Sequence, residues 1–339
     1  RVMSLTTIWF GLITILWVGY LVLEGFDFGV GVLLPFVGRT EAERRAVVAT
    51  IGPVWDGNEV WLLVAGGATF AAFPEWYASL FSGFYLALFL ILVALIVRGV
   101  AFEYRSKRPE SAWRAWWDRA IFMGSVVPAV LWGVAFADIV AGVPLNAAHE
   151  FTGDLLTLLG PYALLGGLTT LGLFITHGAT FLALKSTGVI RQRANAVVGM
   201  AGLVTAVLAV LFLGWTQVHD GDPGSLALSA LAAVCLLGAL LANRLDHEGW
   251  SFAGTAATIA LAVVALFTAL YPDVLPSSTD PAFSLTITNA SSTSYTLGIM
   301  TVVAVIFTPL VLLYQGWTYW VFRRRVGSPR VTDSPPTGS

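Results

Sequence analysis

Long apolar segments, separated by short polar ones, make up most of this chain. A helix needs about 20 apolar residues to cross a bilayer, and the segments that approach or exceed that length are 5–36, 53–73, 78–99, 119–141, 158–184, 195–214, 225–242, 251–271 and 294–322. The pattern therefore predicts an all-α integral membrane protein with nine membrane-spanning helices in one domain, residues 1–326. The tail, 327–339, is rich in Ser, Pro and Gly, and we expect it to be disordered and cytoplasmic.

The basic residues provide a test of this helix count, because cytoplasmic segments of membrane proteins collect Lys and Arg. With nine spans and the N-terminus outside, the inside segments hold 17 of the 18 Lys and Arg residues, at 39–45, 98–119, 185–193, 244 and 323–330; the exception is Arg1. The outside loops hold acids and no Lys or Arg. A wrong count would scramble this alternation, so we expect the N-terminus outside and the C-terminus in the cytoplasm.

Composition agrees with a membrane protein and narrows the function classes. The chain is 57% hydrophobic and 11% charged, against about 25% charged residues in soluble domains. The net charge of −2 argues against a nucleic-acid partner. The single cysteine, Cys235, lies in an apolar run, and there is no CxxC or Cys/His cluster, so a zinc or iron–sulfur site is not expected.

Four acids lie in or beside the first two spans, and these are the candidate site residues: Glu24, Asp27, Asp56 and Glu59. An acid at the centre of a spanning helix costs about 2.5–3.5 kcal/mol on insertion scales, so these side chains must face the bundle. Asp56 and Glu59 are three apart, which places both on one helix face. They form either a proton path or quinone contact, or a structural polar cluster paired with Arg98.

Four further residues of the predicted spans are also of interest. Trp55 and Trp61, which flank Asp56, could stack on a quinone ring or simply pack. Arg98, at the inner end of the third span, is expected to extend its head group to the interface. Asp138, at the outer end of the fourth span, is expected to contact water.

A haem site would need axial His, Met or Cys ligands. Of the four histidines, His149 and His219 fall in outside loops and His247 in an inside loop, which leaves His177 as the single histidine within a span. We expect His177 to be a polar residue facing the bundle. The sequence therefore predicts no haem and no metal site in this chain.

Two local signals concern the ends of helices. Thr40-Glu-Ala-Glu43 has the spacing of a capping box, which predicts a helix that begins near Glu41 and can run through Pro53 with a kink. The polar segment 276–297 is expected to form an ordered external cap that leads into the last span.

Seven motifs, in order along nearly the whole chain, resemble subunit II of the cytochrome bd-type quinol oxidases. They are Glu24–Gly31, Gly52–Trp61, Gly66–Pro74, Arg98–Lys107, Thr176–Thr180, Thr288–Ser292 and Tyr314–Trp320.

The resemblance implies a respiratory terminal oxidase of the bacterial cell membrane that oxidises quinol and reduces dioxygen to water. It implies a haem-bearing subunit I as partner, with two b-type haems, one d-type haem and the quinol-oxidising site, and small accessory membrane subunits are further candidates. Subunit II is expected to have two four-helix bundles plus one helix, and no haem. A structural quinone is a candidate ligand near Trp55 and Asp56. A cytoplasmic proton route is carried over to Asp56, with Asp27, Glu59 and Glu24 as further candidates.

Two alternatives remain open from the sequence. Intramembrane acids also serve proton-coupled transporters, and Gly-Pro at 52–53 and 160–161 is compatible with the broken helices of that class. The chain could also be a purely structural subunit, in which no single acid matters.

Overall fold

The computed structural model describes residues 4–327, and within that range the fold is almost entirely helical. The helices are α1 (Leu5–Val37), α2 (Glu41–Ile51), α3 (Trp55–Ala72), α4 (Pro74–Gly83), α5 (Tyr85–Tyr104), α6 (Ser111–Ala141), α7 (Pro161–Lys185), α8 (Gly188–His219), α9 (Pro223–Arg244), α10 (Glu248–Leu270) and α11 (Ser294–Val321). The predicted all-α architecture is confirmed. The predicted tail, from residue 328 onward, lies outside the described residues.

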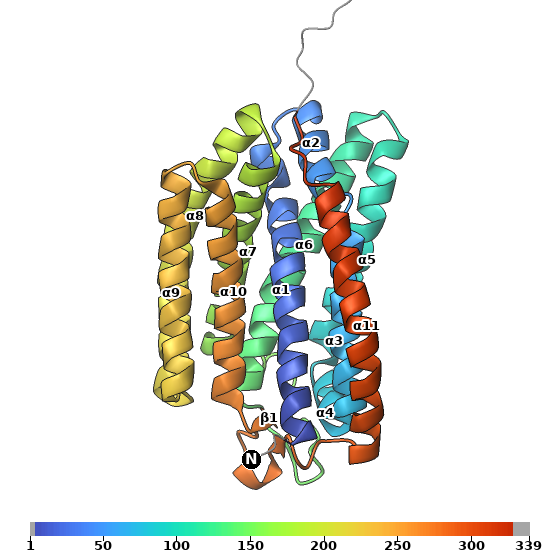
Figure 1. Cartoon of the computed structure of the whole chain (residues 1–339), viewed down its shortest axis with the longest axis vertical. Coiled ribbons are helices and arrows are strands. Elements are labelled where there is room, and N and C mark those ends of the chain that lie inside the picture. Colours follow the sequence, from blue (N-terminus) through green and yellow to red (C-terminus); the bar gives the residue numbers. More distant parts are fainter. Residues whose placement is uncertain (1–3, 328–339) are drawn as a thin grey trace, which may run out of the picture.

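Eight of these helices are long and apolar enough to cross a membrane: α1, α5, α6, α7, α8, α9, α10 and α11. The predicted span 53–73 corresponds to α3, which is not among the eight. The reason is its composition, because Asp56, Asn58 and Glu59 occupy the first turns of a helix of 18 residues. α3 nevertheless runs beside α5 and α11 along the long axis of the molecule (Figure 1).

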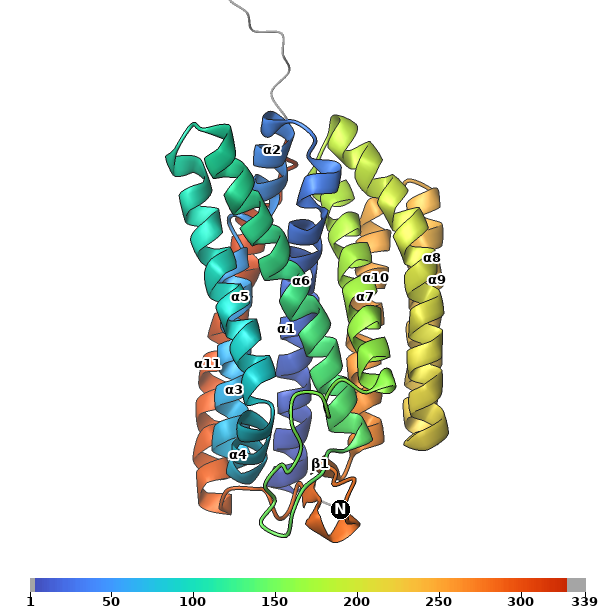
Figure 2. The ribbon, with the colours of Figure 1, turned by 180° about the vertical axis from the view of Figure 1, so that it is seen from behind.

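The long helices lie side by side (Figures 1 and 2), with α7, α8, α9 and α10 together on one side of the molecule and α3, α5 and α11 on the other. α1 and α6 lie between the two groups. Glycines make the central contact between α1 and α7 close: a Cβ on Gly29 would lie 1.8 Å from the carbonyl oxygen of Phe174, and one on Gly178 would lie 2.6 Å from the Cα of Gly29. Small residues allow such close helix approach within membranes.

The helical conformation is interrupted between α2 and α3, at residues 52–54. The capping box at the start of α2 is confirmed, with the Glu43 N–H donating to Thr40 Oγ1 at 3.2 Å and the Thr40 N–H donating to Glu43 Oε2 at 3.1 Å. The helix does not run through Pro53, however, but ends at Ile51. Asp56 therefore lies in the first turn of α3. The predicted segment 78–99 is likewise divided, at Phe84 between α4 and α5.

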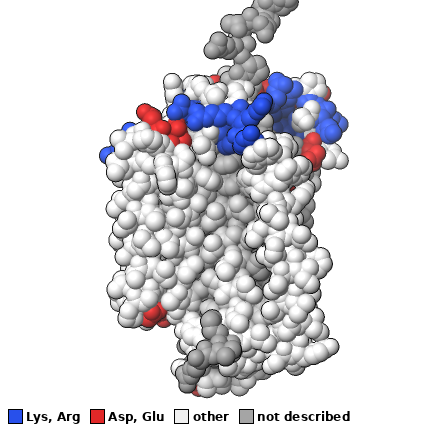
Figure 3. Space-filling model, viewed as in Figure 1, with Lys and Arg blue, Asp and Glu red and all other residues white. Residues whose placement is uncertain are grey.

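The two ends of the bundle differ in charge. Lys and Arg form a band at the end where α2 lies, and the opposite end of the same face shows acids only (Figure 3). At that opposite end, β1 (Asp273–Leu275) and β2 (Leu285–Thr286) pair antiparallel, with the short helix η2 (Pro281–Phe283) between them. The Ser292 N–H donates to the Ala72 carbonyl at 2.8 Å, which ties this segment to α3. The expected ordered cap at 276–297 is confirmed.

Residues 322–326, the C-terminal strap, join the end of α11 to the α7–α8 connection. Lys185 Nζ donates to the carbonyl oxygens of Phe322 and of Arg324, the latter at 3.0 Å, and the Val326 N–H donates to the Lys185 carbonyl at 2.7 Å. The strap thus connects the two groups of helices at the basic end.

Candidate functional site

Arg98 of α5 is the centre of a buried ionic cluster. Its guanidinium donates to Glu24 of α1, and its Nη2 lies 3.1 Å from Glu59 Oε1 of α3. Arg98 and Glu24 are fully buried, whereas the Glu59 side chain keeps 24% of its surface exposed. The expectation that Arg98 reaches the interface was wrong, because two acids from neighbouring helices hold its head group inside the bundle. The other interpretation, a cluster paired with Arg98, describes the geometry.

The surroundings of Arg98 explain why a guanidinium fits at this depth. α6 approaches closely because Gly124 faces Arg98, where a Cβ would lie 2.7 Å from the Arg98 Cβ. The guanidinium carbon lies 4.6 Å from the centroid of the Phe28 ring and 5.6 Å from that of Phe102. Aromatic faces attract cations, and the attraction is stronger away from water. Arg98 is therefore held by charge on one side and by aromatic rings on the other.

A second set of polar residues meets around Asn58 of α3. Its Nδ2 donates to Asp27 Oδ2 of α1 at 2.6 Å, and its Oδ1 accepts from the Tyr319 hydroxyl of α11 at 2.7 Å and from Gln315 Nε2 at 3.4 Å. Asp27 and Asn58 are fully buried. Sequence reasoning did not predict Gln315 or Tyr319 as site residues. Their spacing was the available signal, because two polar side chains four apart in an apolar helix share one face.

Trp55 and Trp61, the two tryptophans of the motif Gly52–Trp61, lie on different sides of α3. Trp61 donates its indole N–H to Gln315 Oε1 at 2.8 Å, and its ring packs where Gly19 of α1 leaves space. Trp55 instead lies against α5, with its ring centroid 5.0 Å from that of Phe102. A single ring therefore cannot stack between Trp55 and Trp61.

Asp56 is exposed, unlike the other three acids. Its Oδ1 accepts from the Gly57 N–H at 2.8 Å. Although Asp56 and Glu59 are three apart, Glu59 turns toward Arg98 while Asp56 stays at the surface. The structure thus brings Glu24, Glu59 and Arg98 together and joins Asp27 to Asn58. Asp56 stays at the surface, apart from both sets.

The ionic cluster around Arg98 and the polar set around Asn58 together have more carboxyl groups than cations. Glu24, Asp27 and Glu59 provide three carboxyls against the one guanidinium of Arg98. Among the described residues, Glu24 Oε2 and Asp27 Oδ1 are buried without a hydrogen-bond partner. A buried carboxylate without a partner is costly, whereas a protonated carboxyl carries no charge. Carboxyl groups in such a setting are the kind of group from which a proton relay can be built.

A separate ionic cluster fixes α2 at the basic end of the bundle. Asp118 of α6 accepts from Arg105 Nε at 2.5 Å and from Arg44 Nη1 at 3.0 Å, and Arg105 also donates to both oxygens of Glu41, at 3.1 and 3.0 Å. Partial burial alone would raise the pKa of Glu41, but the hydrogen bonds and charge of Arg105, aided by Arg114, lower that pKa below its ordinary value. These contacts hold α2 in place and so position the break before α3.

His177 lies in α7, within the group formed by α7, α8, α9 and α10. One ring nitrogen lies 2.7 Å from Thr255 Oγ1 and the other 3.1 Å from the carbonyl oxygen of Val22, and the ring stacks on Phe252. Both nitrogens are thus engaged by the protein, as expected for a residue that faces the bundle. Within residues 4–327, no group of three or more His, Cys, Asp or Glu side chains could hold a metal ion.

Asp138 is more buried than the sequence suggested. It is 8% exposed, and its Oδ2 has no hydrogen-bond partner among the described side chains. The segment 276–297 lies against the end of α6, where the Val143 N–H donates to the Pro276 carbonyl at 3.0 Å. This contact could not be predicted because Val143 and Pro276 are far apart in the sequence.

Comparison with known proteins identifies the family. The model of the family described as cytochrome bd terminal oxidase subunit II matches residues 5–322. Cytochrome bd-I ubiquinol oxidase subunit 2 of Escherichia coli (strain K12) is 39% identical, with 94% of each chain covered. Cytochrome bd ubiquinol oxidase subunit 2 of Bacillus subtilis (strain 168) is 40% identical, with 95% of this chain and 97% of that chain covered.

A solved structure adds a likeness of fold alone. A chain of the bd oxidase from Geobacillus thermodenitrificans aligns with a TM-score of 0.78 at 18% identity, and the alignment covers 94% of this chain and 99% of that one. The family match and both curated relatives span almost the whole sequence, in agreement with the seven motifs. The chain is therefore a member of the cytochrome bd terminal oxidase subunit II family, and so a multi-pass membrane subunit of a bacterial respiratory oxidase complex.

Proposed function

We propose that this chain is the haem-less subunit of a quinol:oxygen oxidoreductase, and that it supplies part of the path by which protons reach its partner from the cytoplasm. The observation that carries the proposal is the gradient of exposure along the acids. Asp56 lies at the surface, Glu59 keeps 24% of its side chain exposed, and Glu24 is fully buried beyond it. Ionisable groups that lead inward from a membrane surface are typical of proton relays.

The proposed partner is a haem-bearing subunit I, which would oxidise quinol and reduce dioxygen to water. Dioxygen reduction consumes protons, and the haems supply the electron chemistry when bound in that partner. The role of this chain is confined to its own groups: Asp56 would take up a proton, Glu59 would pass it inward, and Glu24 and Asp27 would hold it within the bundle. Small accessory subunits remain candidates for the complex.

The proposed topology has nine spans, with α3 as the ninth, the N-terminus outside and the C-terminus in the cytoplasm. α3 runs alongside α5 and α11 in the opposite chain direction (Figure 1), and the basic band of Figure 3 marks the proposed cytoplasmic end. One four-helix bundle would combine α1, α3, α5 and α6, the other α7, α8, α9 and α10, with α11 as the additional helix. Residues 1–326 would form this single membrane domain, followed by a disordered cytoplasmic tail.

A structural quinone would have Trp55 and Asp56 as its contacts in this subunit. These two neighbours lie at the first turn of α3, where Asp56 is exposed. Trp61 drops out of the proposed contact set, because its N–H already donates to Gln315 and its ring faces α1. No step of the proton path is assigned to a quinone.

Substitution of Asp56 tests the proton path. In the purified complex, Asp56→Asn should lower oxygen consumption by about tenfold, the effect of roughly 1.4 kcal/mol on the limiting barrier, while the haem spectrum persists. Glu75→Gln is the matched control. Glu75 is an exposed acid in the first turn of α4, just beyond the end of α3 that is opposite Asp56. Unchanged turnover of an assembled Asp56→Asn complex would remove Asp56 from the path and favour a purely structural subunit.

Purification also separates the proposal from a proton-coupled transporter. A coloured complex with a second large subunit supports the oxidase, whereas a colourless chain that moves a solute alone would support the transporter. One sequence argument for the transporter has weakened, because Gly160–Pro161 lies at the start of α7 and does not interrupt a helix.

A further inference from the structure

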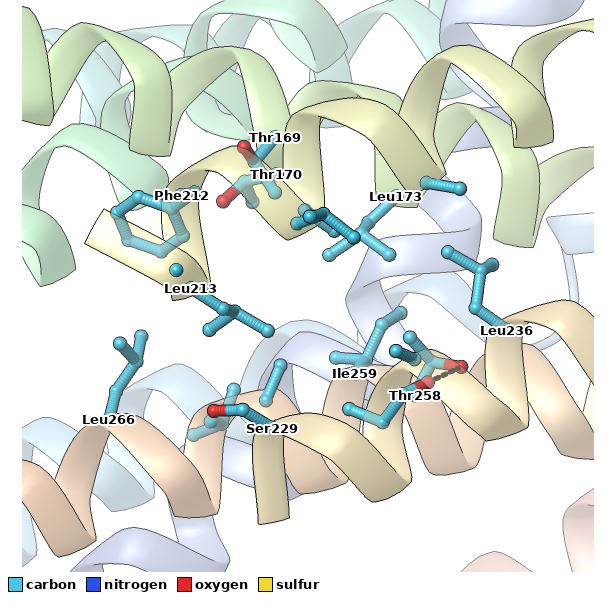
Figure 4. A pocket seen from close by; sticks show the side chains of 18 of the residues that line it. Thr169, Thr170, Leu173, Phe212, Leu213, Ser229, Leu236, Thr258, Ile259 and Leu266 are labelled. Atoms are coloured by element: carbon cyan, nitrogen blue, oxygen red, sulfur yellow. Dashed lines mark hydrogen bonds between the residues drawn. The ribbon is translucent and has the colours of Figure 1, made fainter. Parts of the chain in front are cut away.

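A large apolar cavity lies within the group formed by α7, α8, α9 and α10, away from the acid cluster. Its volume is about 320 Å³. Side chains from α7 and α8, such as Thr169, Leu173 and Phe212, face the space from one side, and Leu236 of α9 and Ile259 of α10 face it from the other (Figure 4). Leu21 of α1 and Phe136 of α6 contribute to the wall nearest the centre of the molecule.

Most of the polar groups in the wall are already hydrogen-bonded within the protein. The hydroxyls of Thr169, Thr170 and Thr258 each donate to a carbonyl four residues earlier in their own helix, at 2.8, 2.9 and 2.8 Å. Ser229 Oγ accepts from Gln217 Nε2 at 3.3 Å. The wall contains no charged side chain. A water molecule would find few partners along this mostly apolar wall, so the wall suits hydrocarbon.

The cavity opens sideways, toward lipid. Three of its wall residues are also exposed on the outer surface of α8 and α9: Val210 (62%), Leu226 (56%) and Leu237 (58%). The wall extends along α9 from Leu226 to Leu237, eleven residue steps, which is about 16 Å at 1.5 Å per residue. One leaflet of a bilayer has a hydrocarbon depth of about 15 Å, half of the whole core. The cavity therefore matches one leaflet in both direction and length.

The end of the cavity near Leu226 lies beside the α8–α9 connection. That loop contains Asp220 and Asp222 and no Lys or Arg. Anionic head groups are recognised by basic side chains, and these are absent from the loop. A lipid with a zwitterionic head group meets no such requirement.

We propose that this cavity binds one acyl chain of a zwitterionic phospholipid from the leaflet at the α8–α9 loop, with the chain entering between α8 and α9. The lipid then completes the packing of the second helix group, because an apolar wall without contact atoms forfeits dispersion energy. Nothing in the proposed proton path is required for this site.

Photolabelling of the complex in nanodiscs tests the site. The probe is a phosphatidylethanolamine with a diazirine at the end of one acyl chain, and labelled peptides are identified by mass spectrometry. We expect label within 206–213 of α8 and 230–237 of α9. Ala233→Phe, which fills the cavity from α9, should lower this labelling by about tenfold. Ala262→Phe fills the cavity from α10 and serves if Ala233→Phe does not assemble.

Ala227→Phe is the matched control, because Ala227 lies on the exposed face of α9 outside the cavity wall, and its labelling should equal that of the unsubstituted complex. Label that persists in both filled variants would overturn the proposal, since it would come from the outer surface. Two further arms identify the source. Stronger labelling by a phosphatidylglycerol probe would overturn the zwitterionic assignment, and labelling by a prenyl-tailed quinone probe that phospholipid does not displace would assign the site to an isoprenoid tail.

Discussion

Replacement of Arg98 by methionine tests whether the buried ionic cluster holds α1, α3 and α5 together. Methionine keeps much of the apolar stem but removes the charge. Glu24 would then be fully buried without its only ionic partner, because it has no other salt bridge among the described residues. Loss of one member of a buried pair destabilises by about 3–5 kcal/mol, since the remaining charge is left uncompensated. The pair with Glu59, whose side chain is 24% exposed, adds about 1 kcal/mol because water partly screens it.

The double variant Arg98→Met/Glu24→Gln separates the pair from general packing effects. Removal of both charges should recover about 2 kcal/mol relative to Arg98→Met alone, which is the coupling expected of residues in direct contact. Unfolding of the purified complex in mixed micelles of increasing denaturing detergent, followed by tryptophan fluorescence, measures these free energies. The control is Arg108→Met, because Arg108 is exposed and lies over Trp113, where about 0.5–1 kcal/mol is expected.

The result that refutes this reasoning is a small loss. If Arg98→Met falls within about 1 kcal/mol of the unsubstituted complex, the pair is not a principal contact between the helices. If the single and double variants are equally unstable, the loss comes from the shape of the side chain and not from the charge left on Glu24.

Three further predictions follow from other contacts. Gly29→Ala should prevent assembly of the complex, because the new Cβ would lie 1.8 Å from the Phe174 carbonyl oxygen; membrane levels of the complex measure this. Asp118→Ala should destabilise by about 1.5–3 kcal/mol in the same micelle titration, the range for a lost hydrogen bond to a charged group, because Arg105 loses the acceptor of its Nε but keeps its pair with Glu41. Because the pKa of Glu41 is lowered in the folded protein, its stabilising effect should be complete above about pH 4.5 and be lost as the pH falls below that, so the difference in stability between Glu41→Gln and the unsubstituted complex should vanish in acid.

The helices could be predicted because their signals are local. Apolar length placed most of the long helices to within about three residues at each end, but it missed the starts of α5, α6 and α8 by seven or eight residues. The Thr40–Glu43 spacing located the start of α2. The breaks were less accurate, since a Gly-Pro pair permits either a kink or an end. In the structure α2 ends at Ile51, and its first turn is tied to Arg105 through Glu41.

The partners of the acids could not be predicted because they are distant in the sequence. Arg98 lies 74 residues from Glu24, and Tyr319 lies 261 residues from Asn58. A sequence shows that an acid in an apolar segment needs a partner, but not which helix provides it. Asn58 itself was noticed only as a neighbour of Asp56, whereas the structure gives it the central position between α1 and α11.

The position of α11 has a consequence for biosynthesis. Gln315 and Tyr319 are translated more than 250 residues after Asn58 and Trp61, yet they satisfy these two residues, which enter the membrane much earlier. Until the ribosome has delivered α11, these groups lack their partners, and the Lys185 contacts of the strap cannot form either. A prematurely terminated chain would therefore expose unsatisfied polar groups to lipid, and membrane quality control could distinguish it from the finished subunit.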